Sequence, residues 1–321
     1  MKRIVIAGEI NVDLIFAGMP SLPELGRETL AESYAQCPGS SSMILAIGLT
    51  RLGDPVRFVG HCGDDAFGQF CIDALRNAGV DTTAIAVDQT LRTGVTVAMS
   101  SCSDRALLTW PGAIATLSAD DVSDSVLRDA QHLHVSSYYL QAKLRSRLTE
   151  LFARASAAGL TTSLDPGSDP EQRWERELID VLRHVDVFLP NQSEALAIAG
   201  AVTPEEALRV FDNGITRTVI KTGRRGAMTL EARDVLSVAA YAVEAVDTTG
   251  AGDSFNAGFL HAWLRGLPMS DCLSWGNACG ALSTRSVGGT TGQGTAGEVL
   301  ALIEAGRSMA RRSGELAQPH S

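Results

Sequence analysis

Hydrophobic residues along the chain follow two alternating spacings. Short uninterrupted apolar runs, such as 4–7, predict buried strands, and helical repeats of apolar residues, such as the one over 44–52, predict helices. Strands are expected at 3–8, 56–60, 132–136, 160–164, 185–189 and 217–221, and near 227–239. Helices are expected at 40–52, 66–78, 142–158, 176–183, 192–199, 204–212, 252–265, 270–284 and 296–306. This alternation predicts an α/β fold with a mostly parallel central sheet flanked by helices.

Two groups of short strands interrupt this alternation, one within 13–36 and one within 84–111. The individual strands are expected at 13–17, 28–34, 84–87, 94–100 and 106–110. Because both groups are embedded in an otherwise regular α/β pattern, they predict a small β-sheet that forms a lid beside the main fold. No repeat or long linker divides the chain, so we expect a single α/β domain over 1–321.

The bulk composition excludes several classes of protein. The chain has 27 basic and 37 acidic residues and a net charge of −10, which argues against nucleic acid as a partner. No uninterrupted apolar run approaches the length of a membrane span. The six cysteines form no C-x-x-C pair, as expected of thiols in a reducing compartment. We therefore expect a soluble cytoplasmic protein without a membrane partner.

The strongest chemical signal lies at 247–259, which reads Asp-Thr-Thr-Gly-Ala-Gly-Asp-Ser-Phe-Asn-Ala-Gly-Phe. Glycine permits close backbone approach, and the unpaired amides at a helix start attract anions. A carboxylate there, Asp253, would repel an anion unless it acts as a base. A base beside an anion site is the combination that phosphoryl transfer to a hydroxyl group needs. The alternative is that Asp253 only caps the helix.

The string over 247–259 resembles the C-terminal signature of the ribokinase-like carbohydrate kinases, also called the phosphofructokinase-B family. Matching elements extend this resemblance over about 3–305. The resemblance implies transfer of the γ-phosphoryl group of ATP to a sugar hydroxyl group, with Mg²⁺ as cofactor. It implies that Asp253 is the catalytic base and that Gly250, Ala251 and Gly252 hold the transferring group. In this family the small sheet covers the sugar and often mediates a homodimer.

Asn11 and Asp13 lie just after the first expected strand, at the edge where parallel α/β folds place ligands. Both residue types also favour turns, so the residues alone leave the two interpretations open. The pattern Gly8-x-x-Asn11-x-Asp13 is similar to the first substrate-binding element of the family. The resemblance therefore implies that Asp13, with Asn11, accepts hydrogen bonds from sugar hydroxyl groups.

The serine-rich start of the helix expected at 40–52 resembles the next substrate-binding signature of the family, with two departures. The family usually has Gly-Gly here and, a few residues later, an Asn that faces the substrate. In this chain Gly39 is followed by Ser40, and Ile44 replaces the Asn. A hydrogen bond that the family commonly gives the sugar is therefore missing, which leaves the usual sugars in doubt as substrates.

Asn191 and Glu194 start the helix expected at 192–199, and their spacing also fits a capping box. The pair matches the Asn-x-x-Glu motif of the family. The resemblance implies that Glu194 helps to organise Mg²⁺ through water and that Asn191 lies near the nucleotide phosphates. Magnesium usually keeps several waters, so one indirect carboxylate is sufficient.

Further nucleotide contacts are implied by resemblance at two other places. The turn that contains Lys221, Thr222, Gly223 and Gly226 ends an expected strand, and the family places this turn against ATP. From the residues alone, a phosphate cradle and an ordinary hairpin loop look alike. Asn277 resembles the position that flanks the adenine.

A monovalent-cation site is implied near the signature. Asp247 and Thr249 resemble part of the family's K⁺ site, and the segment 286–288 would supply further oxygens. The alternative is ordinary packing between two loops.

Three other features receive a structural interpretation or are absent. The aspartates at 64 and 65 are expected to cap the helix at 66–78 rather than bind metal. His132 and His134 point to one face of a strand and are expected to be structural. The chain lacks the P-loop motif and the glycine pattern of a dinucleotide fold.

The sequence thus predicts an ATP-dependent kinase for a sugar or sugar-like acceptor, and three rivals remain. A nucleoside kinase would use the same machinery, with Met43 and Ile44 in an apolar pocket for the base. A sugar-phosphate kinase would need cationic side chains, for which Arg105 in the lid is the obvious candidate. A non-catalytic sugar or nucleotide sensor would bind the same ligands without turnover.

Overall fold

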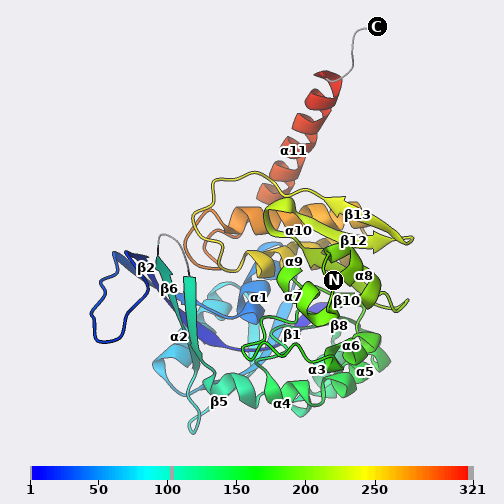
Figure 1. Ribbon diagram of the computed structural model, residues 1–321. Coiled ribbons are helices and arrows are strands. Elements are labelled where there is room, and N and C mark those ends of the chain that lie inside the picture. The colour runs from blue at the N-terminus through cyan, green and yellow to red at the C-terminus, as the bar shows by residue number, and fades with distance from the viewer. Residues whose placement is uncertain (1, 102–104, 317–321) are drawn as a thin grey trace.

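Nine strands form the central sheet of the computed structural model, which describes residues 2–101 and 105–316 (Figure 1). The strands are β1 (Arg3–Ala7), β4 (Val56–Gly63), β5 (Asp81–Asp88), β8 (Ala130–Val135), β9 (Thr161–Leu164), β10 (Val187–Phe188), β11 (Arg217–Lys221), β12 (Ala227–Glu231) and β13 (Asp234–Val238). Their order is β13-β12-β11-β10-β9-β8-β1-β4-β5. Every neighbouring pair from β11 to β5 is parallel, whereas β12 and β13 are antiparallel. The loops after β1, β9 and β11 therefore meet at one edge.

Helices cover both faces of this sheet, as the alternation predicts. One face carries α1 (Ser41–Arg51), α2 (Ala66–Asn77), α9 (Ala251–Trp263), α10 (Met269–Ser283) and α11 (Ala296–Leu316). The other carries α3 (Asp124–Arg128), α4 (Ala142–Arg145), α5 (Leu148–Ala157), α6 (Glu177–Val181), α7 (Gln192–Ala199) and α8 (Pro204–Phe211). Ile4 and Ile6 of β1 belong to the first core, and Val5 and Ala7 to the second. Within the described ranges, no helix is both long and apolar enough to cross a membrane.

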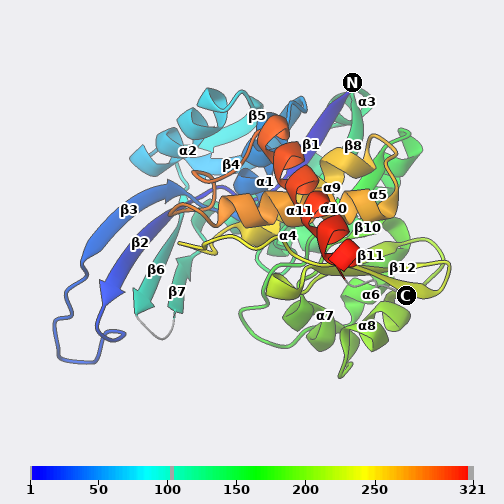
Figure 2. The same ribbon diagram turned by 90° about the horizontal axis from the view of Figure 1, so that it is seen from above.

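A second sheet of four strands stands beside the main body (Figure 2). It consists of β3 (Ser33–Pro38), β2 (Asn11–Met19), β6 (Gly94–Ser101) and β7 (Arg105–Trp110), in that order. The prediction that 84–87 is a lid strand is wrong. This segment belongs to β5, which pairs with β4 at the edge of the main sheet. The lid is therefore built from β2, β3, β6 and β7.

Three expected helices differ from the prediction in their bounds. The helix expected at 142–158 is split into α4 and α5 around Ser146 and Arg147. The helix expected at 176–183 is shorter and passes from α6 into a 3₁₀-helix, η3 (Leu182–His184). The last helix, α11, continues to Leu316 and extends away from the body (Figure 1).

The two structural interpretations of polar residues are confirmed by hydrogen bonds. Asp65 is the N-cap of α2 and accepts from the amide of Gly68 at 2.8 Å. His132 and His134 are buried, and the Ser163 hydroxyl bonds both imidazoles at 2.7 Å. In the described part of the chain, no group of three His, Cys, Asp or Glu side chains is placed to hold a metal ion.

Candidate active site

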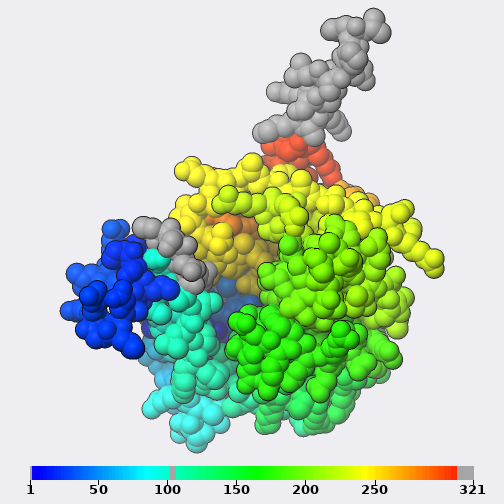
Figure 3. Space-filling model, in the orientation of Figure 1, coloured from blue at the N-terminus to red at the C-terminus, as the bar shows by residue number. Residues whose placement is uncertain are grey.

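A pocket of about 820 Å³ opens at the carboxyl edge of the main sheet. Figure 3 shows it as a hollow between the lid and the main body. Its wall combines the ends of β9 and β11 with the first turns of α1, α7 and α9 and one side of α10. Parallel sheets place binding sites at this edge because loops from several strands converge there.

The signature segment forms the first turn of α9. Gly250 is the N-cap, with φ +69°, and a Cβ there would lie 2.7 Å from the Cα of Gly289, so only glycine fits. Asp253 therefore sits in the first turn rather than at the cap, and the capping alternative is wrong. The helix start leaves the amides of Gly252 and Asp253 without carbonyls one turn earlier. The amide of Ala251 donates to the carbonyl of Thr248 at 3.3 Å.

The Asp253 carboxylate lines the pocket and has an unusual charge environment. Burial in the protein raises its pKa to about 7, and the negative charge of Asp165 acts in the same direction. The cation of Lys221 and a hydrogen bond from Ser41 oppose this shift. A carboxylate with a pKa near neutrality in a pocket is suited to take up and release a proton.

Glu194 of α7 lies at the same pocket and is buried. Burial and the charge of Asp165 raise its pKa to about 7, against the effect of Lys221. Its carboxylate accepts from the Asn191 amide at 2.8 Å, and the Asn191 side chain accepts from the amide of Glu194 at 2.9 Å. The expected capping box is thus present, and the same two residues also line the pocket.

Sequence reasoning missed the partners of Lys221. Its ammonium nitrogen donates to Asp165 Oδ2 at 2.7 Å and to Asn256 Oδ1 at 3.2 Å. Asn256 Nδ2 in turn donates to the same Asp165 oxygen at 2.6 Å. Two signals were available: the chain has 3 lysines against 24 arginines, and Asn256 comes one helical turn after Asp253.

The remaining residues of the expected nucleotide region divide into two groups. Gly223, Gly226 and Asn277 line the pocket, and the Asn277 side-chain amide donates to the carbonyl of Val238 at 2.9 Å. Thr222 is not part of the wall, because its hydroxyl donates to the carbonyl of Gly226 at 2.9 Å and closes the turn.

The expected acceptor residues meet where the lid joins the main body. Asn11 Nδ2 donates to Asp13 Oδ1 at 3.0 Å and to the hydroxyl of Thr96 at 3.2 Å. A Cβ on Gly39 would lie 2.3 Å from Asp13 Oδ1, so glycine is required beside this pair. Asn11 and Asp13 of β2 and Gly39, just after β3, thus form one cluster, which is not part of the wall of the 820 Å³ pocket.

The two residues that depart from the family pattern have structural contacts of their own. Ser40 has φ +68° and ψ +140°, a region that normally requires glycine. Its hydroxyl donates to the carbonyl of Glu9 at 2.8 Å and accepts from the amide of Met43 at 3.0 Å. Ile44 is 3% exposed, and its Cδ1 packs against Gly250 and Gly289 rather than lining an open apolar pocket.

Glu9 is a third residue whose role the sequence did not reveal. It is buried between β1 and α1, and burial raises its pKa. Its carboxylate accepts from the hydroxyl of Ser42 at 2.6 Å and from the hydroxyl of Ser137 at 2.8 Å. These bonds join the ends of β1 and β8 to the start of α1.

The two segments that the resemblance assigns to a cation site lie in contact. Asp247 Oδ1 accepts from the amide of Thr249 at 2.9 Å and from its hydroxyl at 2.7 Å. Asp247 Oδ2 accepts from the amide of Gly288 at 2.9 Å. The structure thus brings together the two segments that the resemblance connects.

Comparison with known proteins agrees with this geometry. The model of the family described as pfkB family carbohydrate kinase matches residues 1–296. The ribokinase of Haemophilus influenzae is 28% identical over 313 residues, covering 94% of this chain and 99% of that protein. The ATP-dependent ribose-1-phosphate kinase of Halopiger xanaduensis is 30% identical over 285 residues, covering 88% and 92%. The structure of a putative ribokinase II from E. coli with ATP and Mg²⁺ has a TM-score of 0.85 and 26% identity, covering 95% and 100%.

Proposed function

The chain belongs to the pfkB family of carbohydrate kinases and is an ATP-dependent sugar kinase, and we propose that Asp253 removes the proton from the acceptor hydroxyl group. One observation carries this role: the carboxylate faces the pocket in the first turn of α9, directly after the glycine turn. The hydroxyl oxygen then bonds the γ-phosphorus, the bond to the bridging oxygen breaks, and ADP leaves. The proton passes to Asp253.

Amides at the start of α9 would stabilise the transferring phosphoryl group. Gly250, Ala251 and Gly252 are the expected cradle, and the positive end of the helix dipole points to the same place. For the amide of Ala251 to contribute, its 3.3 Å bond to the carbonyl of Thr248 must open. Lys221, Gly223, Gly226, Asn191 and Asn277 would contact the nucleotide, because all five line the pocket.

Mg²⁺ fits this site when it is held mainly by phosphate oxygens and water. Glu194 is a single carboxylate on the pocket wall, and its oxygens already accept from Asn191. Contact through water is therefore the arrangement that this side chain supports. Bound magnesium would supply positive charge that stabilises the phosphate oxygens during transfer.

For the acceptor we propose a sugar that Asp13 and Asn11 hold through its hydroxyl groups. The buried packing of Ile44 against two glycines weakens the case for an apolar nucleoside pocket at this place. The cationic side chain that a sugar-phosphate kinase would use, Arg105, lies outside the side chains that the structure describes. Ser40 and Ile44, two of the positions that depart from the family pattern, are the first candidates for an altered sugar preference.

The test is ADP release from Mg-ATP with a panel of sugars, sugar acids, sugar phosphates and nucleosides. We expect one acceptor class to stimulate release, and Asp253→Asn to lower kcat for it by about 10²–10⁴-fold, the usual contribution of a general base. Thermal unfolding and ATP binding should stay close to the wild type. Turnover of the variant at the wild-type rate would refute the base, and ATP binding without any turnover would favour a sensor.

Two further properties are proposed from family resemblance. Asp247 and Thr249 would form part of a K⁺ site, which predicts higher kcat in potassium chloride than in tetramethylammonium chloride. The lid would mediate a homodimer, since Leu107, Leu108 and Trp110 of β7 are exposed. Sedimentation analysis of Leu108→Lys would show a shift to monomer; a wild-type monomer would exclude this dimer.

A further inference from the structure

A closed set of three polar side chains lies behind the proposed base. We call Asp165, Lys221 and Asn256 the Lys221 triad. The ion pair between Lys221 and Asp165 is 2.7 Å long, and its side chains are only 11% and 5% exposed. Asn256 bonds both partners, at 3.2 Å and 2.6 Å. Such a pair needs good geometry and additional hydrogen bonds to offset the cost of burying two charges, and the triad supplies both.

The triad packs directly against the turn that carries Asp253. Asn256 comes three residues after Asp253 on α9, so the two side chains lie on the same side of the helix. The Lys221 ammonium nitrogen lies 3.5 Å from the point where a Cβ on Gly252 would stand. Asp165, Lys221 and Asp253 all line the same pocket. The charges of the triad therefore act on the base at short range.

Groups of several elements face Asp253, and their charges do not balance. They are Asp165 after β9, Lys221 of β11, Glu9 after β1, Glu194 of α7 and the hydroxyl of Ser41 of α1. Lys221 is the one cation in this set, against three other carboxyl groups. Burial and Asp165 raise the pKa of Asp253, whereas Lys221 lowers it.

We propose that Asp165 and Lys221 are positioning residues that, with Asn256, set the pH at which Asp253 becomes a working base. This inference rests on the proposed role of Asp253. Loss of the Lys221 cation leaves the carboxylates uncompensated and favours the protonated form of Asp253. Loss of the Asp165 charge removes repulsion and favours the ionised form. A purely structural triad would change stability without moving this titration.

The experiment compares kcat/KM for the acceptor across neutral pH, at saturating Mg-ATP, in Asp165→Asn and Lys221→Met. On the acidic side, kcat/KM falls as the base becomes protonated, and we call this part of the pH profile the acidic limb. We expect its midpoint to move down by roughly one pH unit in Asp165→Asn and up by roughly one in Lys221→Met, the pKa change that a nearby charge typically causes. The double variant should return toward the wild type. A matched control is the more exposed pair Arg154–Asp124 between α5 and α3, which pack on the other face of the main sheet from α9, with Asp124→Asn and Arg154→Met. Neither control should move the limb.

The proposal would be overturned if the acidic limb of kcat/KM stayed at the wild-type pH in both Asp165→Asn and Lys221→Met, or if it moved in the same direction in both. Thermal unfolding verifies the fold, and if Lys221→Met does not fold, the direction in Asp165→Asn decides. Asp253→Asn separates the assignment of the base from the role of the Lys221 triad. If that variant keeps turnover, the base assignment fails. If it loses turnover while the triad variants keep the wild-type limb, only the role of the triad fails.

Discussion

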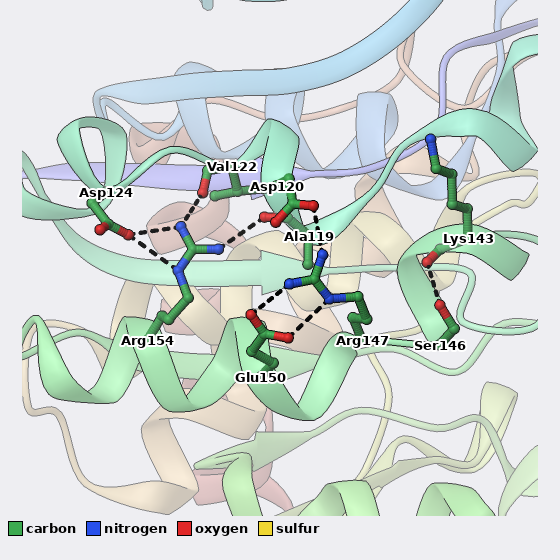
Figure 4. Close-up of polar contacts among 9 residues, drawn as sticks. All are labelled: Ala119, Asp120, Val122, Asp124, Lys143, Ser146, Arg147, Glu150 and Arg154. Atoms are coloured by element: carbon green, nitrogen blue, oxygen red, sulfur yellow. Dashed lines mark hydrogen bonds and ion pairs between the residues drawn. The ribbon is translucent and has the colours of Figure 1, made fainter.

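Two groups of ion pairs in this molecule use the same chemistry in opposite surroundings. At α5, the N-cap residue Arg147 binds Asp120 and Glu150, and Arg154 binds Asp124, in side chains that are 26–69% exposed (Figure 4). At the pocket, Lys221 binds Asp165 in side chains that are 11% and 5% exposed. Water and salt screen the first group, whereas the second acts through protein of low polarisability. The comparison shows that position, more than the number of bonds, decides what an ion pair does.

Two of the exposed pairs link α5 and its N-cap to the segment 120–124, and the third, Arg147–Glu150, lies within the first turn of α5. Arg154 also donates to the carbonyls of Ala119 and Val122, at 2.9 Å and 2.6 Å, so it ties α5 to the segment before α3 (Figure 4). The buried pair is poor evidence for stability, because desolvation offsets most of its attraction. We therefore expect the main effect of this pair at the pocket, where its charges affect the protonation of the neighbouring carboxyl groups.

The largest predicted difference in stability comes from removing one acid of each group. Asp165→Ala removes the carboxylate that is hydrogen-bonded to the buried Lys221 cation and should lower the free energy of unfolding by about 3–5 kcal/mol. Asp124→Ala, its matched control, should cost at most about 1 kcal/mol. Urea unfolding of both variants against the wild type measures the two values. Equal losses would contradict the distinction between the groups.

The dependence of these stability losses on salt concentration should also differ between the exposed and the buried pair, although the expected change is smaller than the one above. Asp124→Asn removes one charge of the exposed pair and leaves the bonds of Arg154 to the carbonyls of Ala119 and Val122 in place, so it should cost about 1 kcal/mol or less at low ionic strength. This loss should shrink in molar sodium chloride, where the Debye length is about 3 Å. The loss in Asp165→Ala should persist there. A buried pair as salt-sensitive as the exposed one would show that water reaches it.

The same comparison explains what could be predicted from the sequence. Apolar periodicity and the glycine turn before Asp253 are local signals, so the sheet, its helices and the carboxylate at the pocket followed from them. Lys221 and Asp165 lie 56 residues apart, and only the parallel order of β9, β10 and β11 brings them together. No local pattern reports such a pairing.

The misplaced strand has a related physical cause. Strand β5 is half-exposed along its length because it lies at the edge of the main sheet. An edge strand and a lid strand therefore show the same mixture of apolar and polar residues. Similarly, the replacement of Asn by Ile44 was visible, but its packing against Gly250 and Gly289 depends on a loop far away in the sequence.

The smallest predicted effect tests the exposed group by itself. Glu150→Gln removes one carboxylate that Arg147 binds within α5, but Asp120 remains as its second partner. Because both arginine and glutamate stay in contact with solvent, we expect no measurable change in the urea midpoint and no movement of the acidic limb of kcat/KM. Either change would mean that charges on α5 reach the pocket. The pH dependence of turnover could then no longer be assigned to the charges around Asp253 alone.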